Sequence, residues 1–293
     1  MRAAYNETND SVKWNASQKP FPRVVTAVMK RVVFNQKGGV GKTSITCNLA
    51  AIGASMGYRT LVIDLDVQGN TTHYLVGEID AEAFPAEAQG VAGLFKQTVG
   101  SRRMQKNPDS FVWETPYENL YLMPSSPVLS DMEKELESRY KIYKLRDALE
   151  KLDGEYDRIY IDTPPNFNFY SKSALIAADS VLVPFDCDSF ARQSLYSLMD
   201  NLAELQEDHN PDLEVEGIVI NQFNSQARLP GELVAELEDE GYPVFNTYLN
   251  TSVKMKESHR EHRPLIDLAP SHKLTGQFLD LHAELEKTLS KAA

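Results

Sequence analysis

The chain has 293 residues, of which 42% are hydrophobic, so it can bury a sizeable core and is not a disordered chain. Its formal net charge of -12 excludes a surface coated with basic residues, and any contact with nucleic acid would have to use a local basic patch. Two cysteines, Cys47 and Cys187, are too few for a disulfide framework and lack the spacing of metal ligands. No apolar run approaches the ~18 residues of a membrane span, and the polar N-terminus does not resemble a signal peptide. These features favour a cytoplasmic protein.

The first segment of the chain shows no hydrophobic periodicity. Residues 1–28 mix Asn, Ser, Thr, Lys and Pro, so we expect a flexible leader. From Arg31 onward, strand and helix patterns alternate, which is typical of a mostly parallel, twisted sheet with helices on both faces. The predicted strands, most of them short and aliphatic or β-branched as in strands buried on both faces, are Val32–Asn35, Thr60–Asp64, Leu120–Met123, Arg158–Asp162, Ser180–Pro184, Val215–Asn221 and Val244–Thr247. We therefore predict an α/β fold with a single domain over residues 29–293.

Three helices can be placed along this pattern. The first is closed by Gly57, and its apolar stripe consists of Ile45, Leu49, Ile52 and Met56. The second is predicted to begin at a capping box formed by Ser130 and Glu133 and to run toward Leu152. The last is predicted over Thr275–Ser290, with one apolar face made of Phe278, Leu281, Leu285 and Leu289.

The most informative segment is a glycine-rich turn that follows the first strand, VVFNQKGGVGKT from Val32 to Thr43. A turn between a strand and a helix directs backbone N–H groups and the positive end of a helix dipole at one anion. Here Lys42 can reach the β- and γ-phosphates of a nucleotide, and the Thr43 hydroxyl can ligate Mg²⁺. The residues predicted to hold the nucleotide are Gly38, Gly39, Val40, Gly41, Lys42, Thr43 and Ser44. The standard phosphate-loop pattern has a glycine where this chain has Gln36, and a second lysine, Lys37, begins the loop.

The sequence of this loop, KGGVGKT, resembles the deviant Walker A motif of the ParA/MinD family of ATPases. Asp64–Asn70, DLDVQGN, is similar to the family segment D-x-D-P-Q-G-N, with Val67 in place of the proline. Asp162–Pro165 resembles the family's Walker B and switch segment. The motifs occur in the family's order and the resemblance covers roughly residues 31–285. It implies a P-loop ATPase that is most similar to the ParA-type partition and positioning proteins.

The resemblance implies ATP and Mg²⁺ as cofactors and assigns roles to particular residues. Asp162 is expected to bind the water shell of the metal held by Thr43, and Asp66 is expected to orient the attacking water. Asp64 is expected to support this network. In the family, the lysine equivalent to Lys37 crosses the interface of a nucleotide-dependent homodimer to the partner's nucleotide. Asn221 resembles the family asparagine that contacts the purine edge.

ParA proteins hold nonspecific double-stranded DNA through basic residues in their C-terminal third. The candidates here are Arg228, Lys254, Lys256, Arg260 and Arg263. Within residues 251–263, four basic side chains against two acidic ones give a local charge of +2 in a strongly acidic chain. Contacts to phosphate alone would give salt-sensitive, sequence-independent binding. We interpret His259 and His262, an H-x-x-H pair with no third ligand nearby, as surface residues.

The function implied by the resemblance is a slow ATPase that binds nonspecific DNA and positions a cargo. The cargo is a plasmid, a chromosome locus or a protein complex, and a ParB-like or other adaptor protein recruits it and stimulates hydrolysis. Such a protein is cytoplasmic and associated with the nucleoid. Two alternatives stay open: a MinD-like spatial regulator that does not use DNA, and a biosynthetic amide-forming enzyme of the same fold. Against them, the C-terminal segment lacks the basic amphipathic pattern of a membrane anchor, and the sequence offers no glutaminase nucleophile arrangement.

Overall fold

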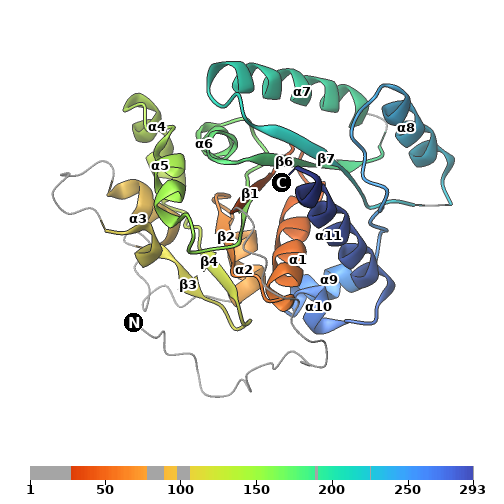
Figure 1. Ribbon diagram of the computed structural model, residues 1–293, viewed down its shortest axis with the longest axis horizontal. Coiled ribbons are helices and arrows are strands. Elements are labelled where there is room, and N and C mark those ends of the chain that lie inside the picture. Colours follow the sequence, from red (N-terminus) through yellow and green to blue (C-terminus); the bar gives the residue numbers. More distant parts are fainter. Residues whose placement is uncertain (1–27, 78–88, 98–105, 189–190, 225, 293) are drawn as a thin grey trace.

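A seven-stranded sheet forms the centre of the computed structural model, which describes residues 28–77, 89–97, 106–188, 191–224 and 226–292 (Figure 1). The strand order is β3-β4-β2-β5-β1-β6-β7. All neighbouring strands pair in parallel except β3 and β4, which are antiparallel. The strands are β1 (Met29–Val33), β2 (Thr60–Asp64), β3 (Trp113–Glu114), β4 (Leu120–Met123), β5 (Arg158–Asp162), β6 (Ser180–Asp186) and β7 (Glu214–Asn221). The predicted α/β class with a mostly parallel sheet is therefore confirmed.

Helices cover both faces of this sheet (Figure 1). One face packs against α3 (Gly90–Lys96), α4 (Leu129–Ser138), α5 (Lys144–Leu149), α6 (Phe169–Ala177), α7 (Ala191–Asp208) and α8 (Arg228–Asp239). The other packs against α1 (Lys42–Ser55), α2 (Asn70–Val76), α10 (Leu265–Leu268) and α11 (Lys273–Ala292), with α9 (Val253–Arg260) beside α10. Short 3-10 helices occupy Pro108–Phe111 and Glu150–Leu152. None of the helices in the described ranges is both long and apolar enough to cross a membrane.

The alternation of side chains along each central strand explains the two-sided core. On β2, Leu61 and Ile63 pack in the cluster under α6 and α7, whereas Val62 packs in the cluster under α1 and α11. Successive side chains of a strand point to opposite faces, so an uninterrupted apolar strand fills both layers. This is the reason that β2, β4 and β5 could be predicted with their observed bounds.

The strand predicted over Val244–Thr247 is wrong. Val244 forms only an isolated parallel bridge with Ile218 of β7. The neighbouring residue is Pro243, whose carbonyl accepts from the Ile218 N–H at 2.7 Å. Proline has no N–H to continue a ladder, so the segment follows β7 only briefly. The antiparallel strand β3 was not predicted, because two residues carry too little pattern.

The capping box predicted at Ser130 and Glu133 is also wrong. Helix α4 is capped at Val128 without a side-chain hydrogen bond, and Glu133 instead accepts from the N–H of Phe169 at 3.4 Å. The long helix predicted as far as Leu152 is interrupted after α4, where Tyr140 has a left-handed φ of 53°. A residue in that conformation ends an α-helix. The leader predicted over residues 1–28 lies, apart from Val28, outside the described residues.

An ionic network is buried at the end of the sheet where β1 and β5 begin. Arg31 is fully buried and donates to Glu216 from Nε, at 2.8 and 3.1 Å from its two carboxylate oxygens, and from Nη2 at 2.9 Å. Arg158 on β5 holds Glu286 of α11 in the same manner, from Nε at 3.1 Å and Nη2 at 2.5 Å. These pairs connect the central strands to the C-terminal helix, and each buried charge has its counter-charge.

Candidate nucleotide site

The predicted motifs meet at the carboxyl edge of the parallel sheet. Residues 34–41 follow β1, Asp66 follows β2, and Asp162, Asp186 and Asn221 are the last residues of β5, β6 and β7. Parallel strands bring all these ends to one edge, where ligands of open α/β sheets bind. The topology therefore gathers residues that are more than a hundred positions apart in the sequence.

The loop after β1 ends at the start of α1 with an uncapped helix terminus. Gly39 and Gly41 have left-handed φ angles of 78° and 91°, and Gly41 is the N-cap, which offers no side chain to the helix N–H groups. A Cβ atom at Gly41 would lie only 2.1 Å from Nδ2 of Asn221, so a larger residue there would have to displace the Asn221 side chain and hold a strained left-handed backbone. The exposed N–H groups and the helix dipole make this terminus suited to an anion.

Lys42 is almost completely buried behind this loop. Its Nζ donates to the carbonyl oxygens of Asn35 and Lys37, both at 3.0 Å, which leaves one of its three N–H groups without a partner among the described residues. Burial lowers the pKa of Lys42, while the carboxylates of Asp162 and Asp66 act in the opposite direction. The free donor and the positive charge can serve a phosphate oxygen.

Asp162 carries the feature that indicates a metal. Its Oδ2 accepts hydrogen bonds from the hydroxyls of Thr43 and Thr71, both at 2.7 Å, whereas its Oδ1 is buried and has no hydrogen-bond partner in the described part of the chain. Burial raises the pKa of Asp162, and the two hydroxyls counteract that rise. A buried carboxylate oxygen beside a threonine hydroxyl is a donor set that Mg²⁺ prefers. The residues present therefore fit the predicted metal.

The two aspartates after β2 have different surroundings. Asp64 is fully buried and accepts from the Thr72 N–H at 2.8 Å, the Thr72 hydroxyl at 2.7 Å and the Asp66 N–H at 3.1 Å. Burial and the nearby Asp162 raise the pKa of Asp64. Its bonds hold the start of α2 to the end of β2, and the supporting role expected of Asp64 stays a prediction. The Asp66 carboxylate accepts from the Gln68 N–H through Oδ1 at 3.0 Å and keeps acceptor capacity for a water.

The segment with Val67 in place of the family proline is a closed turn. The Gly69 N–H donates to the carbonyl of Asp66 at 2.9 Å, which closes a tight turn around residues 66–69. Ser125 donates from its hydroxyl to the same carbonyl at 2.5 Å. The turn is therefore held by two hydrogen bonds that do not depend on a proline.

Lys37 is held by its own chain. Its Nζ lies 2.7 and 2.9 Å from the two carboxylate oxygens of Asp186 and also contacts Asp188. Burial lowers the pKa of Lys37, but these bonds outweigh it, so the pKa is raised. Sequence reasoning missed Asp186, the last residue of β6, and Asp188 two positions later, although acidic residues at the end of a strand were a visible signal.

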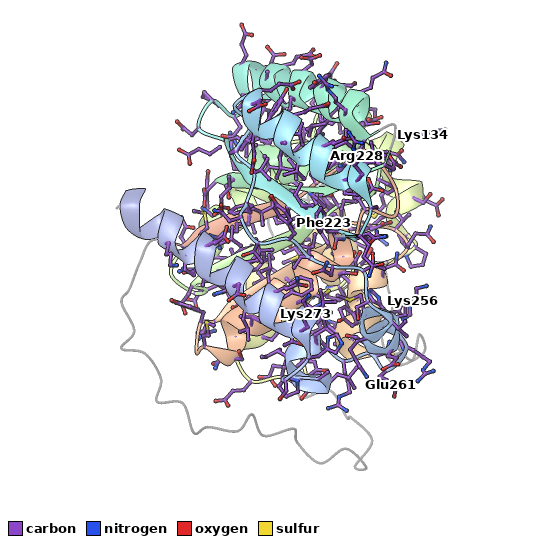
Figure 2. All side chains as sticks on the ribbon, turned by 90° about the vertical axis from the view of Figure 1, so that its right-hand side faces the viewer. Lys134, Phe223, Arg228, Lys256, Glu261 and Lys273 are labelled. Atoms are coloured by element: carbon purple, nitrogen blue, oxygen red, sulfur yellow. The ribbon has the colours of Figure 1, made fainter. Side chains whose placement is uncertain are left out.

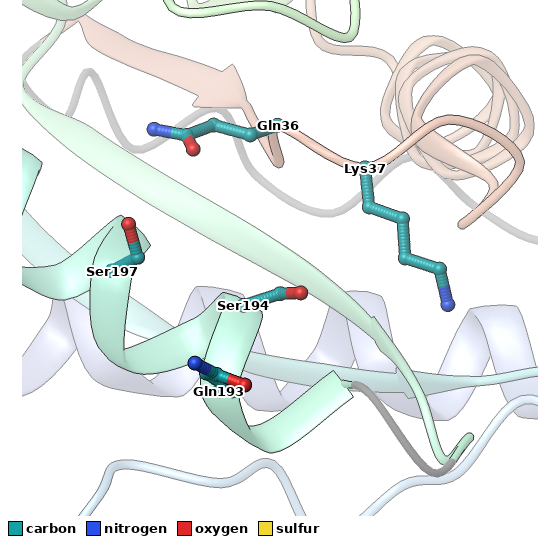
Figure 3. A pocket seen from close by; sticks show the side chains of 5 residues that line it. All are labelled: Gln36, Lys37, Gln193, Ser194 and Ser197. Carbon is teal, nitrogen blue, oxygen red and sulfur yellow. The ribbon is translucent and has the colours of Figure 1, made fainter.

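A pocket of about 410 Å³ opens beside Lys37, between the loop and the start of α7 (Figure 3). Its lining residues are all polar: Gln36, Lys37, Gln193, Ser194 and Ser197. Gln36 stands where the standard loop pattern has glycine, and its Nε2 is buried without a hydrogen-bond partner in the described ranges. The departure from the standard pattern therefore contributes a wall of this pocket.

The candidate DNA-binding residues lie on α8, on α9 and, in the case of Arg263, in the segment between α9 and α10. Figure 2 shows Arg228 on α8 and Lys256 on α9 on the same side of the molecule. Four of the five candidates pair with an acidic neighbour: Arg228 with Glu232, Lys254 with Glu257, Arg260 with Glu261, and Arg263 with Asp267. Lys256 is exposed and forms no ion pair with any described residue. Surface pairs of this kind contribute ~0–1 kcal/mol, so phosphate groups can compete for these cations.

Asn221 lies against the loop rather than in open space. Its Nδ2 donates to the carbonyl of Val40 at 2.8 Å. This contact places Asn221, the predicted purine-edge residue, next to the phosphate loop. One N–H of its side-chain amide is used in the hydrogen bond to Val40.

The interpretation of His259 and His262 as surface residues is wrong for His259. Its Nε2 lies 2.8 Å from the Ser44 hydroxyl oxygen, and its ring stacks on Tyr74 with centroids 4.4 Å apart. His262 has a left-handed φ of 51°, and its Nδ1 lies 2.8 Å from the carbonyl oxygen of His73. Both contacts join residues far apart in the sequence, so spacing alone could not indicate them.

Comparisons with known proteins agree with this geometry. A family model described as an AAA domain matches residues 29–215. The chain is 34% identical over 260 residues to the chromosome partitioning protein ParA of Myxococcus xanthus, with 87% of each chain covered. Among solved structures, apo McdA of Cyanothece superposes with a TM-score of 0.76 at 22% identity, covering 88% of this chain and 99% of that one. Cobyrinic acid a,c-diamide synthase of Mycobacterium smegmatis, with a bound ATP analog and magnesium, gives 0.68 at 29% identity, covering 80% and 92%.

Proposed function

Because this chain belongs to the ParA/MinD family of P-loop ATPases, we propose that it dimerises with ATP, holds nonspecific double-stranded DNA and positions a cargo. It is an ATPase whose cofactors are ATP and Mg²⁺. In this proposal hydrolysis is slow, and a ParB-like or other adaptor protein stimulates it. The protein would then work in the cytoplasm, on the nucleoid.

The observation that carries the proposal is the set of N–H groups and metal-binding oxygens around the phosphate loop. Lys42 presents a spare N–H, α1 presents uncapped backbone N–H groups, and Asp162 presents a carboxylate oxygen, unpartnered among the described residues, beside the Thr43 hydroxyl. When bound, Mg²⁺-ATP supplies the phosphoryl group and the metal charge. Lys42 then neutralises phosphate oxygens, Thr43 and Asp162 hold the metal, and Asp66 orients a water. Phosphoryl transfer needs such positioning and charge neutralisation more than covalent chemistry.

Lys37 is proposed to act across the dimer interface. In the single chain Asp186 and Asp188 hold its ammonium group. A partner's nucleotide phosphates would replace these carboxylates as the counter-charge, so ATP would become part of the interface. Hydrolysis and release of the γ-phosphate would reduce that counter-charge and weaken the dimer. Such an exchange would make the dimer depend on ATP, and the pairing of Lys37 with Asp186 and Asp188 within one chain is the observation that supports it.

The DNA-binding part of the proposal rests on α8 and α9. Arg228 of α8 and Lys256 of α9 lie on the same side of a protein whose net charge is -12 (Figure 2). Arg228 and Lys254 pair with Glu232 and Glu257, which are at least partly exposed and lie four and three positions away. Arg260 pairs with the adjacent Glu261, and Arg263 pairs with the nearly buried Asp267. Lys256 is the best single probe, because it is exposed and unpaired among the described residues. An amide-forming enzyme remains the second candidate, since the M. smegmatis synthase shares the fold at 29% identity.

The experiment that tests the function is binding to random-sequence duplex DNA with ATP, ADP or no nucleotide at two salt concentrations. Lys42→Ala and Lys37→Ala should abolish the ATP-dependent binding, and Lys256→Glu should weaken it and reduce its salt dependence. Lys151→Glu is the matched control, because Lys151 is exposed and precedes β5, at the opposite edge of the sheet. If ATP drives dimerisation but DNA is ignored at low salt, the ParA-type function fails.

A further inference from the structure

Three helices meet in a buried polar junction beside the phosphate loop. We define the α1–α2–α9 junction by Ser44 and Asn48 of α1, Tyr74 of α2, and Ser258 and His259 of α9. Tyr74 and Asn48 are each 1% exposed and Ser258 is fully buried. Buried polar groups that satisfy one another make a stiff, specific contact. The junction therefore fixes the three helices relative to one another.

His259 makes two different contacts in this junction. Its Nε2 forms a hydrogen bond with the Ser44 hydroxyl at 2.8 Å. Its ring lies nearly parallel to that of Tyr74, at an interplanar angle of 7° and a centroid distance of 4.4 Å. The two contacts tie α9 to both α1 and α2.

The remaining members lock the junction together. The Tyr74 hydroxyl lies 2.5 Å from that of Ser258 and accepts from Asn48 Nδ2 at 3.1 Å. Asn48 also accepts from the N–H of Leu265, the first residue of α10, at 2.8 Å. A displacement of α1 or α2 must therefore either move α9 or break buried hydrogen bonds.

The two residues that His259 contacts, Ser44 and Tyr74, stand on helices that border the nucleotide site. Ser44 directly follows Lys42 and Thr43, and it stands in the first turn of α1 at the end that faces an anion. Tyr74 stands on α2, whose start is held by the segment that carries Asp66. His259 therefore links Ser44, which is adjacent to the candidate metal ligand Thr43, to α9, which carries candidate DNA-binding cations.

We propose that His259 is a positioning residue that couples ATP binding to the placement of α9. When Ser44 changes its hydrogen bonding on binding a nucleotide, His259 transmits the change, because its ring is fixed on Tyr74. Coupling between two sites is reciprocal, so a contact on α9 would also change ATP affinity. What α9 does after this change rests on the proposed function, but the coupling itself needs no DNA.

Two substitutions separate the contacts of His259. His259→Phe keeps an aromatic ring on Tyr74 and removes the hydrogen bond to Ser44, whereas His259→Gln keeps a hydrogen-bonding group and removes the stack. The matched control is His209→Phe, because His209 likewise makes a hydrogen bond to a hydroxyl, that of Tyr143 at 2.8 Å, and a ring contact, edge-on with Tyr143, but lies far from the loop. Thermal unfolding confirms that each variant is folded.

The readouts are the dissociation constant of Mg²⁺-ATP and the amide hydrogen exchange of residues 253–260, both without DNA. In the native chain and in His209→Phe, ATP should change the protection of residues 253–260. His259→Phe should weaken ATP binding about fivefold, the worth of one hydrogen bond, and lose the protection change. His259→Gln should retain ATP affinity within about twofold and lose most of the protection change, because it lacks the stack.

Two results would overturn the coupling: no effect of ATP on residues 253–260 in the native chain, or native behaviour of His259→Phe in both readouts. Failure of the DNA-binding function is distinguishable from either. In that case the ATP-dependent protection of α9 and its loss in His259→Phe persist, while random-sequence DNA is not bound.

Discussion

Acidification should destabilise this protein through His282, which lies on α11 against the helix that carries the phosphate loop. His282 is 1% exposed, and its Nε2 has no hydrogen-bond partner among the described residues. Burial lowers its pKa to about 4, with Arg31 and Arg158 contributing in the same direction and Glu286 opposing them. The ordinary histidine pKa is 6.5. The folded state therefore resists a proton that the unfolded chain accepts.

The sign and size of the effect follow from these two pKa values. Well above pH 6.5 the histidine is neutral in both states, so it causes no pH-dependent loss of stability there. As the pH falls from 6.5 toward about 4, only the unfolded chain binds the proton, so the free energy of unfolding decreases. Linkage gives a loss of about 2 kcal/mol at pH 5 and a limit of about 3 kcal/mol below pH 4.

Urea denaturation of the native chain and of His282→Leu at pH 7.5, 6 and 5 measures this contribution. Leucine is similar in size and carries no proton, so the two proteins should differ by about 1 kcal/mol or less at pH 7.5. At pH 5 the variant should have gained about 2 kcal/mol relative to the native chain. Equal pH dependence in the two proteins would refute the reasoning, because all other titrating groups are shared.

Three further substitutions test the site and its support. Gly41→Ala should reduce stability by about 1–3 kcal/mol and weaken ATP binding, since it strains a left-handed residue and crowds Asn221; unchanged thermal unfolding would contradict this. Glu216→Gln should reduce the free energy of unfolding by about 3–5 kcal/mol in urea, because Arg31 stays buried without its main counter-charge, and a loss below 1 kcal/mol would argue against it. Thr43→Val should remove the strengthening of ATP binding by Mg²⁺ in a metal titration, and a retained Mg²⁺ effect would exclude this hydroxyl as a ligand.

Features that depend on neighbouring residues could be predicted from the sequence. The apolar run of strands such as Thr60–Asp64 and the 3.6-residue stripe of α1 are local patterns, and both elements lie where they were predicted. The glycine-rich turn is likewise local, because Gly39 and Gly41 supply left-handed conformations that other residues adopt only with strain. Local pattern was therefore sufficient to place the phosphate loop and the strand-end aspartates.

The distant side chains that complete the site are brought together by the tertiary fold. Lys37 meets Asp186 across 149 positions, and Ser44 meets His259 across 215. The first contact forms because parallel strands end at one edge of the sheet, and the second because α9 packs against α1. Neither arrangement leaves a periodic pattern in the sequence. The break after α4 was missed for a different reason. Tyr140 has a left-handed backbone conformation there, which tyrosine rarely adopts. Periodicity records which face of an element is buried, but the partner on the other side of that face is chosen by the whole fold.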